Sequence, residues 1–239
     1  MKIALIGYGK MGKAIEEIAM QKGHNIVLKI DINNAADLTA ENLENADVAI
    51  EFTGPQSAVN NILKCIEYGV PVVSGSTGWL EEFEKVKQFC NDHNGTLIYA
   101  SNYSIGVNLF FEVNKHLASI MNAYQEYDVI LKEIHHTHKK DAPSGTAITL
   151  AEQVLSNLSR KNKWINEAET TNNNEIAIIS ERIDPAPGTH HVKYSSPIDD
   201  IEIIHTAHNR IGFAGGAIKA ADFAIGKKGI FGMKEVLGL

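Results

Sequence analysis

The sequence predicts an α/β protein in two parts, a doubly wound domain followed by an α+β domain with a mixed sheet. In the first part, short apolar runs alternate with amphipathic stretches of helical periodicity, which is typical of a parallel sheet covered on both faces. After Asn102, alternating runs follow one another without intervening helices, which indicates a mixed or antiparallel sheet. A helix of small residues near the C-terminus completes the pattern.

The first part contains apolar strands separated by helices with one apolar face. Gly23, Gly69 and Gly95 each follow an expected helix, at the position where a left-handed C-cap favours glycine. The expected strands are residues 2–7, 25–31, 47–53, 71–77 and 96–102, and the expected helices are residues 11–22, 57–68 and 80–93.

The second part begins with a helix whose apolar residues recur at helical spacing. A polar segment, residues 160–174, is expected to be an exposed connection. The expected helices are residues 105–121, 144–158 and 214–225, and the expected strands are residues 127–136, 176–183, 189–196 and 200–208.

Composition and charge exclude several classes of protein. Hydrophobic residues make up 44% and charged residues 21%, which is ordinary for a globular protein and excludes disorder or a coiled coil as the whole-chain structure. The 22 Lys and Arg against 29 Asp and Glu give a formal charge of -7, which argues against a nucleic-acid partner.

The cysteines and the N-terminus predict a cytoplasmic protein. Two cysteines, Cys65 and Cys90, are too few for a disulfide framework and fall in apolar helical patterns, so we expect reduced, buried thiols. The apolar run before Gly7 is too short for a signal peptide. No apolar stretch reaches the roughly 18 residues that a bilayer span needs, so no membrane association is expected.

A glycine-rich turn, G-Y-G-K-M-G at residues 7–12, follows the first expected strand and opens the first helix. Gly7 permits the tight turn, Gly9 lets the backbone approach a pyrophosphate, and Gly12 allows close packing of helix and strand. The helix N-terminus offers N–H groups and partial positive charge to phosphates. Asp31 lies 19 residues after Gly12, where a carboxylate can accept the ribose hydroxyls of a dinucleotide.

Two more loops follow strand ends at the same carboxyl edge of the expected sheet. They are F-T-G-P at residues 52–55 and G-S-T-G-W at residues 75–79. Ligands of open α/β sheets bind at this edge, and the small residues leave room for a nicotinamide and its ribose. Taken alone, each loop would be an ordinary strand-to-helix turn.

The segment E-I-H-H-T-H-K-K-D-A-P-S-G-T-A, residues 133–147, combines a strand end with a helix start. Successive strand residues point to opposite faces, so His135 and His136 share a pocket only if the strand ends there. Ser144 can cap the next helix, which presents the Gly145 and Thr146 amides at its N-terminus as a site for a carboxylate. The imidazoles and lysines add positive charge that suits a dianionic substrate and proton transfer near neutral pH.

Seven of the ten histidines lie between His135 and His208, which raises the question of a metal. No H-E-x-x-H or C-x-x-C spacing is present, and lysines beside His138 would repel a cation, so no metal is expected. We expect His24, His93 and His116 at solvated helix ends. The remaining histidines, His190, His191, His205 and His208, lie on expected strands, where packing or solvent exposure explains them as well as catalysis does.

Together, G-Y-G-K-M-G, G-S-T-G, A-S-N-Y-S-I-G-V-N, R-I-D-P-A-P-G-T-H and above all residues 133–147 resemble the 4-hydroxy-tetrahydrodipicolinate reductase (dihydrodipicolinate reductase) family of bacterial lysine biosynthesis. The resemblance covers essentially the whole chain. It implies NAD(P)H-dependent reduction of 4-hydroxy-tetrahydrodipicolinate to tetrahydrodipicolinate, a step toward diaminopimelate and lysine, with NADH or NADPH as the cofactor.

The resemblance also implies the site residues. His135 is the proton donor or acceptor and Lys139 the proton donor, while His136, Gly145 and Thr146 hold the carboxylates of a small dicarboxylate substrate. The residues implied for the cofactor are Gly7, Tyr8, Gly9, Lys10, Met11, Gly12, Asp31, Gly75, Ser76, Thr77, Ala100, Ser101, Asn102 and Tyr103.

The expected organisation follows from the resemblance and the element pattern. A Rossmann-type cofactor domain comprises residues 1–103 and 213–239, and a substrate-binding and oligomerisation domain comprises residues 104–212. The resemblance implies a homotetramer. One departure from the family pattern is Asp184-Pro185-Ala186-Pro187, which replaces a glycine-bearing turn.

Two other functions fit part of the sequence. A semialdehyde dehydrogenase on the same cofactor domain would need a nucleophilic cysteine at the cofactor edge, and both cysteines fall within expected helices. A non-catalytic dinucleotide sensor would need the glycine loop but not His135, His136 and Lys139. Alanine variants of those three residues would therefore leave a sensor working.

Overall fold

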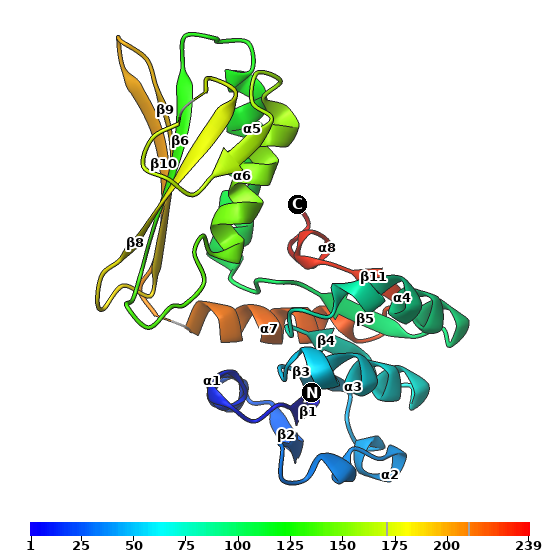
Figure 1. The fold of residues 1–239 in the computed structure, drawn as a ribbon. Coiled ribbons are helices and arrows are strands. Elements are labelled where there is room, and N and C mark those ends of the chain that lie inside the picture. The colour runs from blue at the N-terminus through cyan, green and yellow to red at the C-terminus, as the bar shows by residue number, and fades with distance from the viewer. Residues whose placement is uncertain (171, 210) are drawn as a thin grey trace. The chain divides into compact units, whose positions relative to one another are not determined.

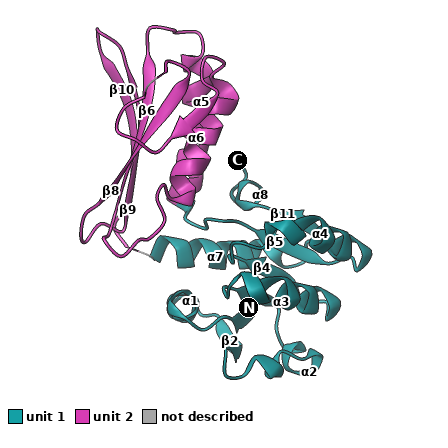
Figure 2. Ribbon diagram, in the orientation of Figure 1, with its two compact units in different colours: residues 1–105, 211–239 teal, residues 106–210 magenta. Residues whose placement is uncertain are grey.

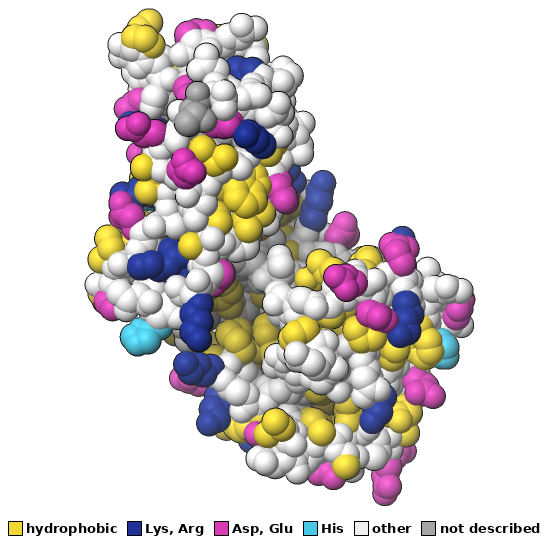
Figure 3. All heavy atoms as spheres, viewed as in Figure 1, with side chains coloured by type: hydrophobic (Ala, Val, Ile, Leu, Met, Phe, Trp, Pro, Cys, Tyr) yellow, Lys and Arg dark blue, Asp and Glu magenta, His cyan; other side chains and the backbone are white. Residues whose placement is uncertain are grey.

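A computed structural model describes residues 1–170, 172–209 and 211–239. The chain forms two compact units, one of Met1–Ile105 with Ile211–Leu239 and one of Gly106–Arg210 (Figure 2). The sequence placed these borders at 103/104 and 212/213. On the face shown in Figure 3, acidic and basic side chains are interspersed over both units. None of the helices formed by the described residues is long and apolar enough to cross a membrane.

The first unit contains a parallel sheet in the order β11-β5-β4-β3-β1-β2 (Figure 1). β1 lies between β2 and β3, so the order of the strands reverses at β1. Open α/β sheets bind ligands in the crevice at the carboxyl ends of the strands beside such a reversal. The strands are β1 (Lys2–Ile6), β2 (Asn25–Ile30), β3 (Val48–Glu51), β4 (Val72–Ser74), β5 (Thr96–Tyr99) and β11 (Gly229–Phe231).

Helices cover both faces of this sheet because alternate strand residues point to opposite sides. Ile3 and Leu5 pack with α1, α7 and α8, whereas Ala4 and Ile6 pack with α2, α3 and α4. The doubly wound fold predicted from the sequence is therefore confirmed. The helices are α1 (Lys10–Gln21), α2 (Ala40–Leu43), α3 (Pro55–Glu67), α4 (Phe83–Asp92), α7 (Ile211–Ala224) and α8 (Met233–Leu237), with short 3-10 turns η1 (Ala35–Asp37) and η2 (Leu80–Glu82).

The glycine C-caps were predicted correctly at two helices and wrongly at one. Gly23 and Gly69 have φ of 76° and 74°, as the left-handed conformation requires. After α4 the left-handed residue is Asn94, with φ of 46°, and not Gly95. Glycine is needed at position 95 for another reason, since a Cβ there would lie 2.7 Å from Ile66.

The second unit is a mixed sheet in the order β10-β9-β6-β8-β7. β6 pairs antiparallel with β9 and parallel with β8, so the prediction of a mixed sheet is also confirmed. Its strands are β6 (Asp128–His135), β7 (Lys163–Ile165), β8 (Glu175–Arg182), β9 (Gly188–Ser195) and β10 (Asp200–Ala207), and its helices are α5 (Ile105–Met121) and α6 (Gly145–Asn157).

One face of this sheet carries α5 and α6. Val129, Leu131 and Val192 lie on that face and pack against both helices in a single core. The segment 160–174 is not wholly an exposed connection, because Trp164 and Ile165 are half-buried in β7, which pairs with β8. Residue 171 of that segment lies outside the described residues.

Candidate functional site

The glycine turn at the start of α1 has the geometry of a dinucleotide cradle. Gly7 has φ of 96°, and a Cβ there would lie 2.0 Å from the Phe52 carbonyl oxygen. A Cβ on Gly12 would lie 2.3 Å from the Gly7 carbonyl oxygen, whereas a Cβ on Gly9 would meet nothing within 4 Å. Two glycines therefore allow close packing and the third borders open space beside the helix N-terminus, an arrangement that fits a pyrophosphate.

Asp31 directly follows β2 and is partly exposed. Its Oδ1 accepts hydrogen bonds from the backbone N–H (3.1 Å) and the side-chain amide (3.4 Å) of Asn33. Nearby, Lys29 forms an ion pair of 2.6 Å with Glu16 and lies 4.9 Å from the centre of the Tyr8 ring. The Tyr8 hydroxyl also donates to Glu16, so Lys29 is already engaged by an acid and an aromatic ring.

The other residues predicted for the cofactor lie at the carboxyl ends of β4 and β5. Ser76 is buried and donates a hydrogen bond of 2.7 Å to Glu51. Tyr103 is also buried, and its hydroxyl donates to the carbonyl oxygens of Ser74 and Ile98. Tyr103 thus holds two strand ends together, and its side chain contributes packing rather than an exposed hydroxyl.

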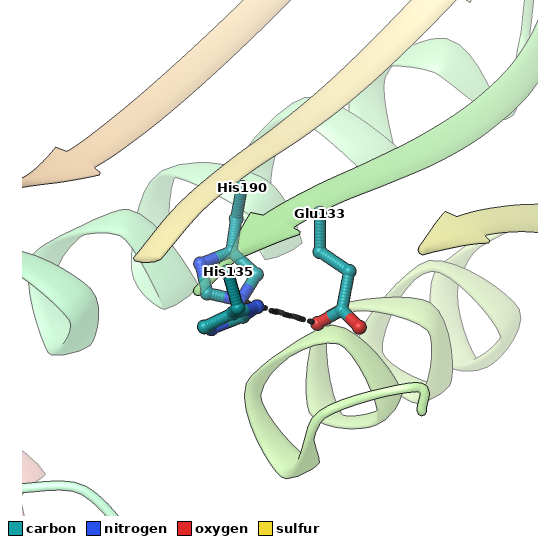
Figure 4. Close-up of side chains that lie close together, drawn as sticks. All are labelled: Glu133, His135 and His190. Carbon is teal, nitrogen blue, oxygen red and sulfur yellow. Dashed lines mark ion pairs between the residues drawn. The ribbon is translucent and has the colours of Figure 1, made fainter. Parts of the chain in front are cut away.

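In the second unit, the strand ends gather acidic, basic and imidazole groups on one face. Glu133 and His135 are two residues apart on β6 and point to the same side, and Glu133 lies directly opposite His190 on β9. All three side chains are buried and lie close together (Figure 4). β6 ends at His135, so His136 begins a loop, as a shared pocket for the two histidines requires.

Glu133 is the centre of this cluster. Its two oxygens each accept a hydrogen bond of 3.1 Å from the Ser144 backbone N–H, and Oε1 lies 3.2 Å from Nη2 of Arg182. Oε2 lies 3.4 Å from Nδ1 of His135 and 3.8 Å from Nε2 of His190. Burial alone would raise the pKa of Glu133, but the hydrogen bonds from Ser144 and the charge of His135 lower it below the ordinary value.

Both histidines have pKa values below the ordinary value for an imidazole. Burial lowers the pKa of His135, and the nearby charge of Lys139 contributes to the lowering, although Glu133 opposes it. Burial lowers the pKa of His190 to about 3. Glycine at position 188 leaves room for the His135 ring, since a Cβ there would lie 3.1 Å from Nε2.

Arg182 links the sheet to the loop that contains Lys139. Besides pairing with Glu133, its guanidinium donates to the backbone carbonyl oxygens of Lys139 (3.3 Å) and Asp141 (2.5 Å). The Lys139 ammonium binds both oxygens of Asp141, at 2.9 and 2.8 Å. Lys139 is therefore held at a half-buried position, with its charged end bound to the Asp141 carboxylate.

The structure also accounts for the departure at residues 184–187. Asp184 accepts hydrogen bonds from the backbone N–H (3.1 Å) and the hydroxyl (2.5 Å) of Thr137. In this chain, the Asp184 side chain therefore holds the turn against the loop beside His136.

As predicted, Ser144 caps α6, with its hydroxyl accepting from the Ala147 N–H at 3.2 Å. The helix therefore begins at Gly145, followed by Thr146, next to the histidine cluster.

Glu133, His135 and His190 also have a spacing that three metal ligands could have, with ligand atoms within 4.8 Å of one another. The Arg182 guanidinium and the Ser144 N–H already occupy the Glu133 oxygens. A cation would have to displace both and face a neighbouring positive charge. The absence of a metal therefore stays our prediction.

Sequence reasoning missed three members of the cluster: Glu133, Arg182 and His190. Their proximity depends on the register of β6 with β8 and β9, which pairs Glu133 with His190 and His135 with Arg182. The advance signal is a glutamate that follows Val129 and Leu131 on the same face of the expected strand, two residues before the first histidine. A buried acid at such a position needs partners.

We expect the free energy of unfolding to decrease at low pH because of these histidines. A group whose pKa is lower in the folded than in the unfolded chain stabilises the fold above its unfolded pKa, near 6.5, and loses that contribution as pH falls. For His190, with a pKa of about 3, the loss between about pH 7.5 and 4.5 is roughly 2 to 3 kcal/mol. Denaturant unfolding at both pH values measures it. The His190→Asn variant should show a shallower dependence, and an equally steep one would contradict the assignment.

These features define a class of protein: a pyridine-nucleotide-binding α/β unit joined to an α+β unit that carries an acid–base cluster. Two family models confirm the class. "Dihydrodipicolinate reductase, N-terminus" matches residues 1–103, and "Dihydrodipicolinate reductase, C-terminus" matches residues 106–237.

Curated relatives agree with the family models. A 4-hydroxy-tetrahydrodipicolinate reductase of Christiangramia forsetii is 47% identical over 99% of this chain and 98% of its own length. One from Neisseria meningitidis is 33% identical over 94% of this chain and 84% of its own. A solved dipicolinate-bound dihydrodipicolinate reductase from Paenisporosarcina sp. has the same fold, with a TM-score of 0.77, 23% identity and 97% of each chain covered.

The chain therefore belongs to the dihydrodipicolinate reductase family. It is an oxidoreductase that uses a pyridine nucleotide, and the family and the function predicted from the sequence are confirmed.

Proposed function

We propose that the chain reduces 4-hydroxy-tetrahydrodipicolinate to tetrahydrodipicolinate, with loss of water, using residues of the Glu133 cluster and the Lys139 loop for proton transfer. The observation that supports this most is the pair of buried Glu133 with partly exposed Arg182, which ties the strand carrying His135 to the loop carrying Lys139. Both residues of the predicted acid–base pair are thus fixed by one network.

His135 and Lys139 have different roles in this proposal. Hydride addition to the unsaturated ring leaves negative charge that a proton must neutralise. The Lys139 ammonium donates that proton, since its contact with Asp141 can be exchanged for a contact with the substrate. Burial lowers the pKa of His135, and in this proposal His135 positions the reacting ring through a hydrogen bond and accepts or returns a proton.

The dicarboxylate is held at the start of α6. The partial positive charge of the helix N-terminus at Gly145 and Thr146, together with His136, favours a carboxylate there. Dipicolinate, the molecule named for the solved relative, is likewise a dianion with two carboxylates. The basic groups around this loop suit such a ligand in a chain that is acidic as a whole.

In the first unit, the chain holds a dinucleotide by its glycine turn, Asp31 and the loops after β4 and β5. The cofactor supplies the hydride when bound. The residues that we propose to contact it are those predicted from the sequence: Gly7, Tyr8, Gly9, Lys10, Met11, Gly12, Asp31, Gly75, Ser76, Thr77, Ala100, Ser101, Asn102 and Tyr103.

We expect NADH to bind at least as tightly as NADPH. Asp31 would repel a 2′-phosphate, and Lys29, the basic residue closest in sequence, is engaged by Glu16. Fluorescence titration with both cofactors measures the preference, and Asp31→Asn should shift it toward NADPH. If the unaltered protein binds NADPH at least tenfold more tightly than NADH, a difference of about 1.4 kcal/mol, this prediction is wrong.

The buried thiols disfavour the semialdehyde dehydrogenase alternative. Cys65 and Cys90 are unpaired and fully buried in α3 and α4. Burial, with a smaller contribution from Glu51, raises the pKa of Cys65 to about 12. A thiol that stays protonated and inaccessible is a poor nucleophile.

We further propose a cytoplasmic homotetramer. Two unpaired cysteines are typical of a reducing compartment. Ile201 and Ile204 on β10 are 38% and 53% exposed, which leaves apolar side chains on the outer strand of the second sheet for a subunit contact.

The reaction is tested by supplying the substrate with its synthase and following the loss of dihydronicotinamide absorbance. We expect loss that depends on both the synthase and this protein. Oxidation of the cofactor that continues without the synthase, or none with it, would overturn the proposal.

A further inference from the structure

Glu51 is a buried carboxylate in the first unit that the proposed chemistry does not use. It is the last residue of β3 and has no exposed surface. Its Oε2 accepts a hydrogen bond of 2.6 Å from the Ser74 hydroxyl, and its Oε1 accepts one of 2.7 Å from the Ser76 hydroxyl. Oε1 also accepts from the backbone N–H (3.0 Å) and the hydroxyl of Thr53.

All of these contacts are donated to the Glu51 carboxyl oxygens. Three hydroxyl groups and one amide donate to its two oxygens, and hydrogen bonds of this kind stabilise the charged form. Among the residues that the structure describes, no lysine, arginine or histidine forms an ion pair with Glu51. Among the described residues, hydroxyl and amide dipoles therefore contact the Glu51 carboxylate.

Two neighbouring groups respond to this charge. Burial chiefly raises the pKa of the Cys65 thiol, and the charge of Glu51 raises it further. The same two causes, in the same order, raise the pKa of Tyr103. The negative field of Glu51 thus extends to residues on α3 and on the segment after β5.

The position of Glu51 relates this charge to the cofactor. The glycine turn follows β1, and Asp31, proposed to hold the adenosine ribose, follows β2 on one side of it. The other half of a dinucleotide bound there would extend toward the ends of β3, β4 and β5 on the opposite side. Glu51 joins the loops that follow β3 and β4 there, through Thr53 and Ser76.

We propose that Glu51 is a positioning residue that joins these two loops and also favours the positively charged, oxidised nicotinamide over the reduced one. This inference rests on the proposed binding of the cofactor at this edge. Hydride donation breaks the C4–H bond of dihydronicotinamide and forms a C–H bond on the substrate with the same electron pair. A proton completes the reduction of the substrate, and the neutral ring becomes a pyridinium cation.

A negative charge at the end of β3, beside the loops where we propose that the nicotinamide binds, would stabilise the cation as it forms. Glu51 therefore makes the bound cofactor a better hydride donor. The serine and threonine hydroxyls keep the carboxylate in place without neutralising it, which a lysine or arginine partner would do.

The test compares affinities rather than rates. Titrations of the purified protein with NAD⁺, NADH and ADP-ribose are measured for the wild type and for Glu51→Gln, which removes the charge. We expect Glu51→Gln to weaken NAD⁺ binding about tenfold more than NADH binding, equivalent to about 1.4 kcal/mol. ADP-ribose, which lacks the nicotinamide, should bind equally well to both proteins.

Two further variants separate charge from structure. Ser74→Ala removes one hydrogen bond and Glu51→Asp shortens the side chain, but both keep the charge, so the NAD⁺ to NADH affinity ratio should stay within about twofold of the wild-type ratio. If Glu51→Gln fails to fold, the test relies on Glu51→Asp. A tenfold change in the NAD⁺ to NADH affinity ratio of that variant overturns the inference.

Equal losses for all three ligands in Glu51→Gln would show a structural role only and overturn the inference while leaving the proposed function intact. A wild-type protein that binds neither NADH nor NAD⁺ would overturn both.

Discussion

Replacing Lys139 or His135 with alanine is expected to lower kcat by about 10²–10⁴-fold, the usual contribution of a positioned acid or base. This corresponds to roughly 3–5 kcal/mol of activation free energy. Cofactor affinity should stay unchanged, since both residues lie in the second unit and the glycine turn lies in the first. Steady-state kinetics in the coupled assay and NADH titration measure the two effects.

The matched control is Lys140→Ala. Lys140 is exposed, adjacent to Lys139, and makes the same change in charge when replaced. We expect it to change kcat less than about threefold. If Lys140→Ala and Lys139→Ala reduced kcat equally, the loop would act only by attracting an anionic substrate.

Glu133→Ala is expected to have the largest effect on stability, a loss of about 3–5 kcal/mol in the free energy of unfolding. The substitution leaves the Arg182 guanidinium without its carboxylate and removes the acceptor for the Ser144 N–H at the start of α6. It also removes the acid beside His135, so residual activity should be low even at temperatures where the variant is folded. Chemical denaturation gives the first quantity and kcat the second.

An exposed acid on the neighbouring strand provides the control. Glu181 pairs with Lys132 at 2.8 Å, with side chains 35% and 37% exposed. Exposed pairs contribute up to about 1 kcal/mol, so Glu181→Ala should cost no more than that. Similar losses for Glu133→Ala and Glu181→Ala would refute the central place we give to Glu133.

The sequence was sufficient for the features that depend on local pattern. Apolar strands between amphipathic helices predicted the first sheet, and the spacing of Gly7, Gly9 and Gly12 predicted a cradle in which one glycine borders open space. Ser144 was predicted as the cap of the helix that follows it in the sequence. Each of these depends on residues close together in the chain.

Features that depend on distant pairing could not be predicted in the same way. β7 and β11 are strands of three residues at sheet edges, too short for a recognisable alternation. The burial of Glu133 follows from the register of three strands, and that of Glu51 from the adjacency of two parallel strand ends. In both cases the sequence signal was an acid among apolar residues. The hydrogen-bond partners of that acid come from distant parts of the chain and are known only from the fold.

The most direct test of the proposed chemistry is the kcat of Lys139→Arg. Arginine keeps the positive charge and can still bind Asp141 or a substrate carboxylate, but it does not release a proton near neutral pH. If Lys139 is the proton donor, kcat should fall nearly as far as in Lys139→Ala, while KM changes little. A Lys139→Arg variant with kcat close to that of the wild type would contradict this account, because charge alone would then explain the contribution of Lys139.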